Sequence, residues 1–412
     1  MEIVITHGVR TPIGKIGASL SKVSDLELAS LVINELVNNR AKLDAEKIDH
    51  VILGEVRQSS DPSNIARTAA LAAGIPETVP AYTVHRQCGS GLQAIMDAYQ
   101  LIACGEAKVV VAGGAENMSQ SAYFMRGTQA GLGSGNYTIE DSLVAGGPGS
   151  TPAHLYGSLP MGLTAENLAD TYGITREAQD RFAQTSQERM AAAIAEGRFK
   201  EQIVPVEIKT GEEVRLFDTD EHPFLSTIEK ISALRPVFKK GGSVTAANSS
   251  GRNDGASAVL IMERETAEQL GYKPMAVIRA IAASGCEPRV MGLGPVRSTE
   301  IALERAGLTI HDLDVIELNE AFAAQSLAVV EEWKKWGISE AELSEKINPN
   351  GGAIAHGHPL GCTGAALSVK CMYELKRVSK KKLGLITLCC AGGLGVAVIL
   401  EKIDQENKIQ PA

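Results

Sequence analysis

Residues 87–94 read QCGSGLQA and residues 359–366 read PLGCTGAA, and the agreement between these two stretches decides the fold. In each, a cysteine among small residues opens a helical pattern. An apolar strand pattern and the tripeptide AGG follow, the tripeptide beginning at Ala112 in the first case and at Ala391 in the second. Chance similarity of glycine-rich turns is the alternative. The matching order favours duplication of one α/β unit.

Strand and helix patterns alternate along the chain. Apolar runs typical of buried strands are HVILG (50–54), KVVVAGG (108–114), AVIRAIAA (276–283) and LITLCC (385–390). Helical patterns cover residues 25–39, 88–104, 164–171, 175–197, 298–306, 320–336 and 362–377. This alternation predicts an α/β fold. Residues 121–160 are rich in Gly, Ser, Thr and Pro, and here we expect a loop subdomain over a binding site.

The composition excludes several classes of protein. The chain of 412 residues has a net charge of −9, which argues against a nucleic-acid partner. We expect no membrane span and no export signal, because no apolar stretch has the required length or flanks. The seven cysteines follow no regular framework, so free thiols in a reducing cytoplasm are expected. With 41 glycines and only 4% aromatic residues, we expect close contacts between elements.

Two helix starts carry residues that are able to do chemistry. Cys88 follows a strand-like segment, AYTVH (81–85), and a helix terminus at this position favours the thiolate. A buried structural cysteine at a tight turn is the alternative. Asn319 lies in LNEAFAAQ (318–325), where the simplest interpretation is a helix N-cap. The functional alternative is an amide that positions a water or a carbonyl group.

Two histidines and a cysteine lie together in AHGHPLGCTG, residues 355–364. The spacing of His356, His358 and Cys362 matches no common zinc site, and no second pair of ligands is nearby, so we predict no metal. Pro359 restricts the backbone of His358 to extended conformations, while the surrounding glycines permit a sharp loop. The pattern predicts a catalytic base that is held rigidly in this loop.

Adjacent cysteines end a buried strand in LCCAGGLGVAV, residues 388–398. Because side chains alternate along a strand, we expect one of Cys389 and Cys390 to face a site and the other the core. The AGG turn allows backbone N–H groups to point at a ligand. Two cysteines, a histidine and an asparagine among such turns suit acyl transfer through a thioester, followed by proton abstraction beside a carbonyl.

This constellation resembles the thiolase family, which contains acetyl-CoA C-acetyltransferases and 3-ketoacyl-CoA thiolases. The resemblance runs from RTPIGK near the N-terminus to CCAGGLGVA near the C-terminus, and the order CGSGLQA, NEAF, GHP and C-x-x-G-G-x-G is highly specific. It implies that Cys88 is the acylated nucleophile and that His358 activates it. It further implies that Asn319 fixes a water in the oxyanion site and that Cys389 exchanges the α-proton of acetyl-CoA. The backbone N–H groups of Cys88 and Ala391 would form a second oxyanion hole.

The resemblance also implies the substrates and the architecture. Acetyl-CoA, acetoacetyl-CoA and CoA would be interconverted by reversible Claisen condensation, with no bound cofactor. The implied thiolase fold has two duplicated α/β halves in five α-β-α-β-α layers with an inserted loop domain. The halves would be residues 1–120, completed by about 243–270, and residues 271–412, with a lid over the CoA site at 121–242. A homodimer or homotetramer is expected. Expected CoA contacts are Ser250, Met161, Phe238, Ala246, Met291 and Phe322. For the apolar residues among them, packing in the core is the alternative interpretation.

Four positions depart from the family pattern. Pro160 replaces a histidine that is frequent before the TAEN stretch, as it does in degradative relatives. Phe224 stands where many members have an arginine along the CoA nucleotide, and Arg252 stands where an aliphatic residue is common. His356 occupies a position that is frequently apolar, and we interpret it as structural rather than as a second base.

Other activities fit parts of the pattern. A degradative 3-ketoacyl-CoA thiolase would use the same residues on longer acyl chains. A ketosynthase-like enzyme would favour a second histidine, or a site without Cys389. A cysteine hydrolase would have no use for a second active-site cysteine. A non-catalytic thiolase-fold binding protein would be expected to lack Cys88, His358 or Cys389, all of which are present.

Overall fold

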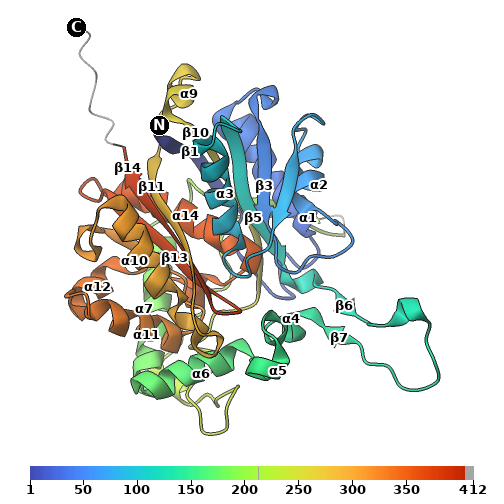
Figure 1. Ribbon diagram of the computed structural model, residues 1–412, viewed down its shortest axis with the longest axis vertical. Helices are drawn as coiled ribbons and strands as arrows, with labels where there is room; N and C mark the ends of the chain where they lie inside the picture. The colour runs from blue at the N-terminus through green and yellow to red at the C-terminus, as the bar shows by residue number, and fades with distance from the viewer. Residues whose placement is uncertain (212, 404–412) are drawn as a thin grey trace.

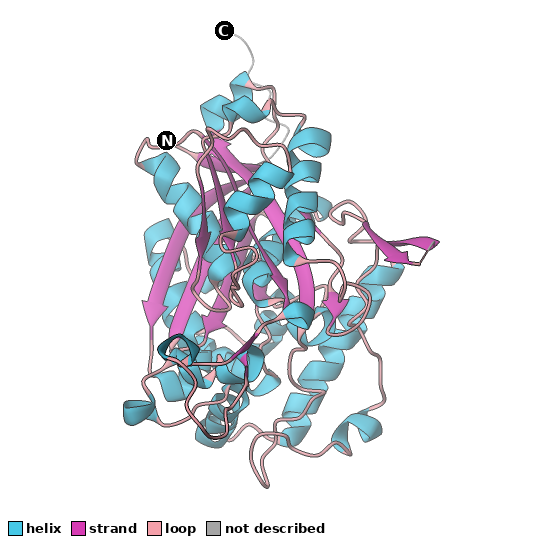
Figure 2. Cartoon of the chain, turned by 90° about the vertical axis from the view of Figure 1, so that its right-hand side faces the viewer, coloured by secondary structure: helices cyan, strands magenta, loops and turns pink. Residues whose placement is uncertain are grey.

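The computed structural model describes residues 1–211 and 213–403 of the chain, so the last nine residues of the predicted C-terminal half lie outside the described range. Two groups of strands and three layers of helices form the five layers that the sequence predicts (Figures 1 and 2). None of the described helices is long and apolar enough to cross a membrane.

The first group of strands has the order β1-β10-β5-β3-β4. Its members are β1 (Ile3–Arg10), β10 (Asn253–Glu263), β5 (Val109–Asn117), β3 (His50–Gly54) and β4 (Ala81–Val84). The strands β1, β10 and β5 pair antiparallel, whereas β5, β3 and β4 pair parallel. A short strand, β2 (Gly14–Lys15), pairs with β10. A long insertion separates β5 from β10 in the sequence, so this group of strands is built from two separate segments of the chain.

The second group repeats the same order and directions. It consists of β11 (Ala276–Gly285), β14 (Leu394–Lys402), β13 (Leu383–Cys390) and β12 (Val315–Leu318). The strands β11, β14 and β13 pair antiparallel, and β13 pairs parallel with β12. A parallel bridge between Ile316 and Ile347 takes the place that β4 has in the first group. This repetition agrees with the predicted duplication, and a short antiparallel contact between β1 and β11 joins both groups into one sheet.

Helices separate and cover the two groups of strands. Between them lie α3 (Ser90–Ala103) and α14 (Leu360–Arg377), as Figure 1 shows. The outer face of the first group packs against α1 (Asp25–Asn34), its π-helical continuation Glu35–Ala41 and α2 (Ile65–Ala72), with α9 (Arg264–Gln269) following β10. The second group packs against α10 (Gly294–Ala306), α11 (Ala323–Lys334) and α12 (Glu340–Lys346). Both β5 and β13 are buried along almost their whole length, which explains why their sequences are continuously apolar.

The two central helices approach each other through glycine. A Cβ atom on Gly91 of α3 would lie 2.5 Å from the carbonyl oxygen of Gly361 in α14. A Cβ atom on Gly364 would lie 2.3 Å from the backbone nitrogen of Leu92. Only glycine leaves room for backbones at this separation. The close contacts expected from the composition are therefore found at the centre of the molecule.

The insertion between β5 and β10 lies at one end of the sheets. It contains β6 (Tyr123–Phe124), β7 (Glu140–Asp141), α4 (Ser142–Ala145), α5 (Ala153–Tyr156), α6 (Met161–Tyr172), α7 (Arg176–Ala195), β8 (Val206–Thr210), β9 (Glu213–Phe217) and α8 (Ile228–Ser232). Figure 1 shows the hairpin of β6 and β7 projecting from the body, while α6 runs beneath the second group of strands.

A buried ion pair ties this insertion to the first group of strands. Arg10, at the end of β1, donates to both carboxylate oxygens of Asp220 at 2.7 and 2.9 Å. Asp220 also accepts from the backbone N–H of Ile13 at 2.8 Å. Both charged side chains are almost fully buried, and bidentate pairing offsets the cost of desolvating them. The RTPIGK and DEHPF stretches therefore meet in the fold and position the insertion.

Candidate active site

Three of the four predicted catalytic side chains line one cavity. Its volume is about 290 Å³, near the lower end of the roughly 300–1,000 Å³ typical of ligand sites. Cys88, His358 and Cys389 face it, together with Ala391. Asn319 lies beside His358, with its side-chain nitrogen 3.5 Å from Nε2 of the imidazole. Cys88 comes from the N-terminal half and the others from the C-terminal half, so the site forms where the halves meet.

A tight turn between β4 and α3 places Cys88. Gln87 adopts the left-handed conformation with φ of +49°, which is uncommon for a residue other than glycine. The hydroxyl of Ser90 braces the turn, since it donates to the carbonyl of Gln87 at 2.6 Å and accepts from the N–H of Arg86 at 2.9 Å. The helix α3 begins at Ser90, so Cys88 stands just before its first turn. Backbone strain of this kind is concentrated at functional sites.

The thiol of Cys88 is not acidic, although part of the side chain reaches the cavity. Burial raises its pKa to about 11. The N–H groups of Ala391 and of Cys88 itself hydrogen-bond the sulfur, and the positive charge of Arg57 also lowers the pKa, but burial has the larger effect. Backbone N–H groups therefore do favour the thiolate, as expected for this position, but their effect is smaller than that of burial. A base must remove the proton before the sulfur is able to attack.

His358 is suited to be this base. Its backbone N–H donates to Oδ1 of Asn253 at 2.9 Å, which fixes the loop that follows α13 (Ala353–His356). The preceding residue, Gly357, has φ of +96°, and a Cβ atom there would clash with Asn253 at 2.4 Å. Burial lowers the pKa of His358 to about 4, so the imidazole is neutral near pH 7. The rigid loop that the sequence predicts is therefore present.

Thr363 decides which imidazole nitrogen is free. Its hydroxyl donates to the carbonyl of Pro359 at 2.8 Å and lies 2.7 Å from Nδ1 of His358. Since the hydroxyl proton is already donated, its oxygen accepts from Nδ1–H. Nε2 is then the unprotonated nitrogen: its lone pair accepts the long 3.5 Å bond from the amide of Asn319 and is the one able to take a proton from the cavity. Thr363 is a positioning residue that sequence reasoning did not single out.

Thr363→Val removes this acceptor while keeping the shape of the side chain. We expect alkylation of Cys88 by iodoacetamide at pH 7 to slow by roughly 5- to 150-fold, which corresponds to the ~1–3 kcal/mol cost of an unsatisfied buried donor. Peptide mass mapping separates Cys88 from the other thiols. Thr363→Ser keeps the acceptor and should react like the wild type. An unchanged alkylation rate in a folded Thr363→Val protein would exclude the positioning role.

Asn319 does not cap a helix, which corrects the simpler interpretation of its motif. The helix α11 begins at Ala323, its N-cap position is Phe322, and no side chain hydrogen-bonds there. The side chain of Asn319 is instead fully buried beside His358. Its neighbour Glu320 holds this turn, because its carboxylate accepts from Ser186, Asn348 and the backbone of Ile354. The chain leaves the strand with an irregular turn that presents the amide of Asn319 to the site.

The adjacent cysteines face opposite sides, as alternation predicts. Cys389 lines the cavity, whereas Cys390 belongs to the core between the two groups of strands. Gly89 lies against Cys390, where a Cβ atom would be 2.7 Å from Sγ. Burial raises the pKa of Cys389 well above that of a free thiol, and the nearby Cys88 and Cys286 thiols add to the effect. The proximity of Cys286 had no signal in the sequence pattern.

The residues predicted to contact CoA fall into two places. Five of them line the cavity that holds Cys88, namely Ser250, Met161, Phe238, Met291 and Phe322. The rings of Phe238 and Phe322 meet edge to face at 6.1 Å. Ala246 instead lines a neighbouring cavity of about 410 Å³, together with Phe224, His222 and Lys15. Phe224 is 67% exposed there, and Arg252 lines the cavity of Cys88.

His356 and Cys362 do not reach the cavity. His356 is 1% exposed, and within the described chain neither of its ring nitrogens has a hydrogen-bond partner. Burial lowers the pKa of His356 well below its usual value, with smaller effects of Lys370 and Arg10. Cys362 is buried in α14. Among the described residues, no group of three or more His, Cys, Asp or Glu side chains is arranged to hold a metal ion.

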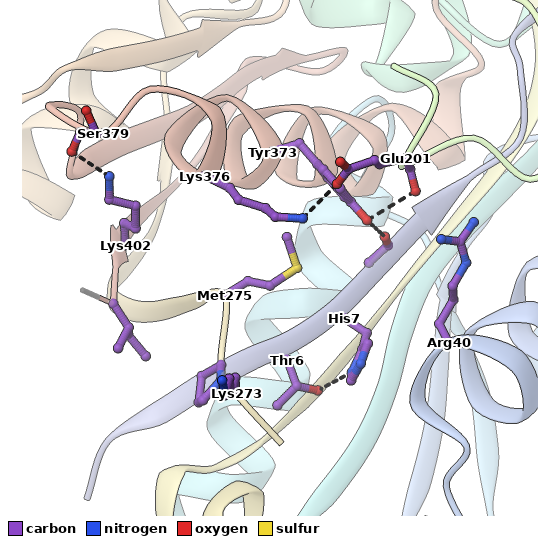
Figure 3. A pocket seen from close by; sticks show the side chains of 13 residues that line it. Thr6, His7, Arg40, Glu201, Lys273, Met275, Tyr373, Lys376, Ser379 and Lys402 are labelled. Carbon is purple, nitrogen blue, oxygen red and sulfur yellow. Dashed lines mark hydrogen bonds and ion pairs between the residues drawn. The ribbon is translucent and has the colours of Figure 1, made fainter. Parts of the chain in front are cut away.

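A larger cavity, of about 950 Å³, contains none of the predicted site residues. It lies beside β1 and the C-terminal part of α14, and Figure 3 shows its lysine and arginine side chains. Most of these cations already have partners. Lys376 pairs with Glu201 at 2.6 Å, and Lys402 donates to the carbonyls of Val378 and Ser379. The largest volume therefore does not coincide with the predicted catalytic residues, which line the cavity of Cys88.

Comparisons with known proteins agree with this fold and this set of residues. The family models for the thiolase N-terminal domain and the thiolase C-terminal domain match residues 3–265 and 272–402. The chain belongs to the thiolase family. It is 46% identical over 404 residues to the acetyl-CoA acetyltransferase of Syntrophomonas wolfei, covering 98% of this chain and 99% of that one.

A second relative and two solved structures are also similar to the chain. The chain is 46% identical over 406 residues to beta-ketothiolase BktB of Cupriavidus necator, covering 98% of this chain and 99% of that protein. The crystal structure of the Bacillus anthracis acetyl-CoA acetyltransferase superposes with a TM-score of 0.92 at 43% identity, covering 98% and 99% of the two chains. Human mitochondrial 3-ketoacyl-CoA thiolase gives 0.90 at 39% identity, with the same coverage. The five-layer fold predicted from the sequence is thus the thiolase fold.

Proposed function

We propose that the protein is an acetyl-CoA C-acetyltransferase that condenses two molecules of acetyl-CoA to acetoacetyl-CoA and CoA, and catalyses the reverse reaction. The observation that carries the proposal is the shared cavity of two cysteines and one histidine whose Nε2 is unprotonated. Relatives named acetyl-CoA acetyltransferase, at 44–46% identity over nearly the whole chain, support it. The substrates are CoA thioesters, and the reaction requires no bound cofactor.

In the first half-reaction Cys88 accepts the acetyl group. Nε2 of His358 takes the thiol proton, and Sγ attacks the carbonyl carbon of acetyl-CoA. The carbon–sulfur bond to CoA then breaks, and the proton passes to the departing CoA sulfur. The neutral imidazole is needed because burial keeps the thiol of Cys88 protonated. General-base assistance of this kind typically contributes about 10²–10⁴ in rate.

In the second half-reaction Cys389 exchanges the α-proton. As a thiolate it removes a proton from the methyl group of the second acetyl-CoA, and the resulting carbanion attacks the acetyl group on Cys88. Acetoacetyl-CoA leaves, Cys88 is expelled as a thiolate, and the proton on Cys389 passes to it, so that both sulfurs return to their starting protonation states. The raised pKa of Cys389 makes its thiolate a strong base in this direction. In the reverse direction the same pKa keeps Cys389 protonated, ready to donate to the enolate.

Two groups of donors would stabilise the developing negative charge. Nε2 of His358, when protonated, and a water held by Asn319 would receive the oxygen of the substrate thioester. The N–H groups of Cys88 and Ala391 would receive the oxygen of the acetyl group, and their contact with the Cys88 sulfur supports this assignment. Removing one such donor typically costs about 2.7–4 kcal/mol of transition-state stabilisation.

CoA would enter along the face that the insertion covers. Met161 and Phe238, from the insertion, and Ser250, just beyond it, line the cavity of Cys88, which supports a lid formed by residues 121–242. The apolar walls suit the pantetheine arm. The lid completes a molecule in which residues 1–120 with about 243–270 form one half and residues 271–412 the other.

A degradative role on longer 3-ketoacyl chains is the second candidate. It is supported by the resemblance to beta-ketothiolase BktB and to human mitochondrial 3-ketoacyl-CoA thiolase. The small volume of the cavity favours short acyl groups instead. A hydrolase or a non-catalytic binding protein would leave the pair of Cys88 and Cys389 without a role.

The protein is expected to act as a homodimer or homotetramer in the cytoplasm. The β6–β7 hairpin supports association, because it projects from the body with exposed apolar side chains. These side chains are Tyr123, Phe124, Leu132, Tyr137 and Ile139. Seven cysteines without a disulfide among the described residues are compatible with a reducing compartment.

The test is thiolysis of acetoacetyl-CoA by the wild-type enzyme and CoA, with mass analysis of the enzyme after mixing with acetyl-CoA alone. We expect two molecules of acetyl-CoA for each acetoacetyl-CoA cleaved, and one acetyl group on the peptide that contains Cys88. Release of free acetate would indicate a hydrolase. Binding of CoA without any acetyl-cysteine would indicate a non-catalytic protein.

A further inference from the structure

The wall of the catalytic cavity carries positive charge without a compensating carboxylate. Among the described residues that line it, the charged side chains are Arg57 and Arg252, and none is Asp or Glu. The acetyl group of the proposed reaction is neutral, so no part of it pairs with a cation beside Cys88. The two arginines differ in place, because Arg252 is exposed beside Ser250, whereas Arg57 is half-buried and its charge acts on the Cys88 thiol.

Arg57 is held between the first group of strands and the lid. It follows β3, and its backbone N–H donates to Oε1 of Glu116 at 2.9 Å. Its guanidinium lies flat against Gly146, immediately after α4, where a Cβ atom would be 2.1 Å from Nη1 and 2.4 Å from Cζ. Only glycine at position 146 leaves room for the side chain of Arg57. The guanidinium of Arg57 is confined between the lid and the turn that carries Cys88.

In the described part of the chain no carboxylate pairs directly with this guanidinium, although the buried Glu116 lies near enough to interact with its charge. Within residues 1–211 and 213–403 its nitrogens make no hydrogen bond or ion pair, and Nε is buried without a partner. The nearest candidate, Glu116, is occupied by the N–H groups of Val56, Arg57 and Gly361. Leaving a charged donor half-buried and unpaired is unfavourable unless a ligand completes it.

We propose that Arg57 binds a carboxylate at the far end of the acyl group on Cys88, so that the enzyme also accepts short acyl chains that end in a carboxylate. This inference rests on the proposed function. A guanidinium presents two parallel donors that match a carboxylate. The phosphates of CoA are a less suitable partner, because the pantetheine arm separates them from the sulfur, whereas Arg57 acts on the thiol that carries the acyl group.

The extended reaction balances without a further reactant. In thiolysis of a 3-ketoacyl-CoA, Cys88 attacks C3, the C2–C3 bond breaks and its electrons move to C2, which takes a proton from Cys389. Acetyl-CoA leaves, and an acyl chain with a terminal carboxylate stays on Cys88, paired with Arg57. Free CoA then attacks this thioester, its thiol proton passes by way of His358 to the Cys88 sulfur as the carbon–sulfur bond to Cys88 breaks, and the acyl-CoA leaves.

The experiment compares two substrates of equal length. These are 3-ketoadipyl-CoA, which ends in a carboxylate, and 3-ketohexanoyl-CoA, which ends in a methyl group. The readout is the ratio of their kcat/KM values, from which effects on the common CoA part cancel. We expect the wild type to prefer the carboxylate by about tenfold or more, and Arg57→Met to bring the ratio close to unity. Arg57→Lys keeps the positive charge but loses the two parallel N–H donors, and it should give a ratio between these values.

Arg252→Met is the matched control, since it removes the other cation of the same cavity. It should leave the ratio as in the wild type, and a fall there instead of in Arg57→Met would overturn the proposal. So would a wild-type ratio at or below unity, or a ratio that Arg57→Met does not change. If the wild type cleaves acetoacetyl-CoA but neither longer substrate, this inference fails alone. If it cleaves none of the three, the proposed function fails as well.

Discussion

Cys88→Ala is expected to abolish both thiolysis of acetoacetyl-CoA and the acetylation of the enzyme by acetyl-CoA. In the proposed mechanism the sulfur of Cys88 carries the acetyl group, and among the described thiols that line the cavity only Cys88 stands in the turn before α3. Cys389 shares the cavity, but it lies at the end of a strand instead of before a helix, and burial raises its pKa well above that of a free thiol. The loss should be at least about 10³-fold in kcat/KM, as for other enzymes from which the nucleophile is removed.

The control for Cys88→Ala is Cys104→Ala. Cys104 is exposed at the end of α3, the same helix that follows Cys88, and is remote from the cavity lining. This variant should keep wild-type activity and wild-type acetylation. Substantial activity in a folded Cys88→Ala protein, or acetyl found on a different cysteine, would contradict the assignment of the nucleophile.

Cys389→Ala is expected to separate the two half-reactions. Acetyl transfer from acetyl-CoA to Cys88 should continue, because His358 and its partner Thr363 are untouched. Formation and cleavage of the carbon–carbon bond should slow by about 10²–10⁴-fold, the usual contribution of a positioned proton-transfer group. Exchange of labelled CoA into acetyl-CoA measures the first step, and loss of deuterium from the methyl group of acetyl-CoA measures the second.

Cys390→Ala provides a matched comparison in the same strand. The neighbouring side chain points into the core and packs against Gly89, so its truncation should lower stability rather than change proton exchange. Equal loss of CoA exchange and of methyl-proton exchange in Cys389→Ala would mean that Cys389 supports the structure of the site instead of moving the α-proton.

Sequence patterns were sufficient for the parts of the molecule that local rules determine. Continuous apolar runs marked β5 and β13 because both faces of these strands are buried. Alternation correctly separated Cys389 from Cys390. The helix boundaries were less well determined, since the pattern predicted a helix from residue 320 whereas α11 begins at Ala323. There an irregular turn, stabilised by long-range bonds to Glu320, overrides the usual capping preference.

Features that depend on distant segments carried no such signal. Burial, which raises the pKa of Cys88, depends on the lid and on β13 as well as on its own helix. The tautomer of His358 depends on the hydroxyl of Thr363, and nothing in the order of residues shows that this proton is already donated to Pro359. Arg57 was not singled out at all, because its place beside Gly146 arises only when the insertion folds back over the strand.

The close approach of α3 and α14 at glycine sets the distance between Cys88 and His358, the proposed nucleophile and base. Cys88 lies three residues before Gly91, and His358 lies three residues before Gly361, so each reactive side chain is a fixed step along the backbone from the point of contact. A methyl group on Gly91 would meet the backbone of α14, and one on Gly361 would meet the backbone of β3 and β5, so either would move a helix start and carry the sulfur or the imidazole from its place. Substitution of Gly91 or Gly361, neither of which has a side chain, is therefore expected to impair catalysis.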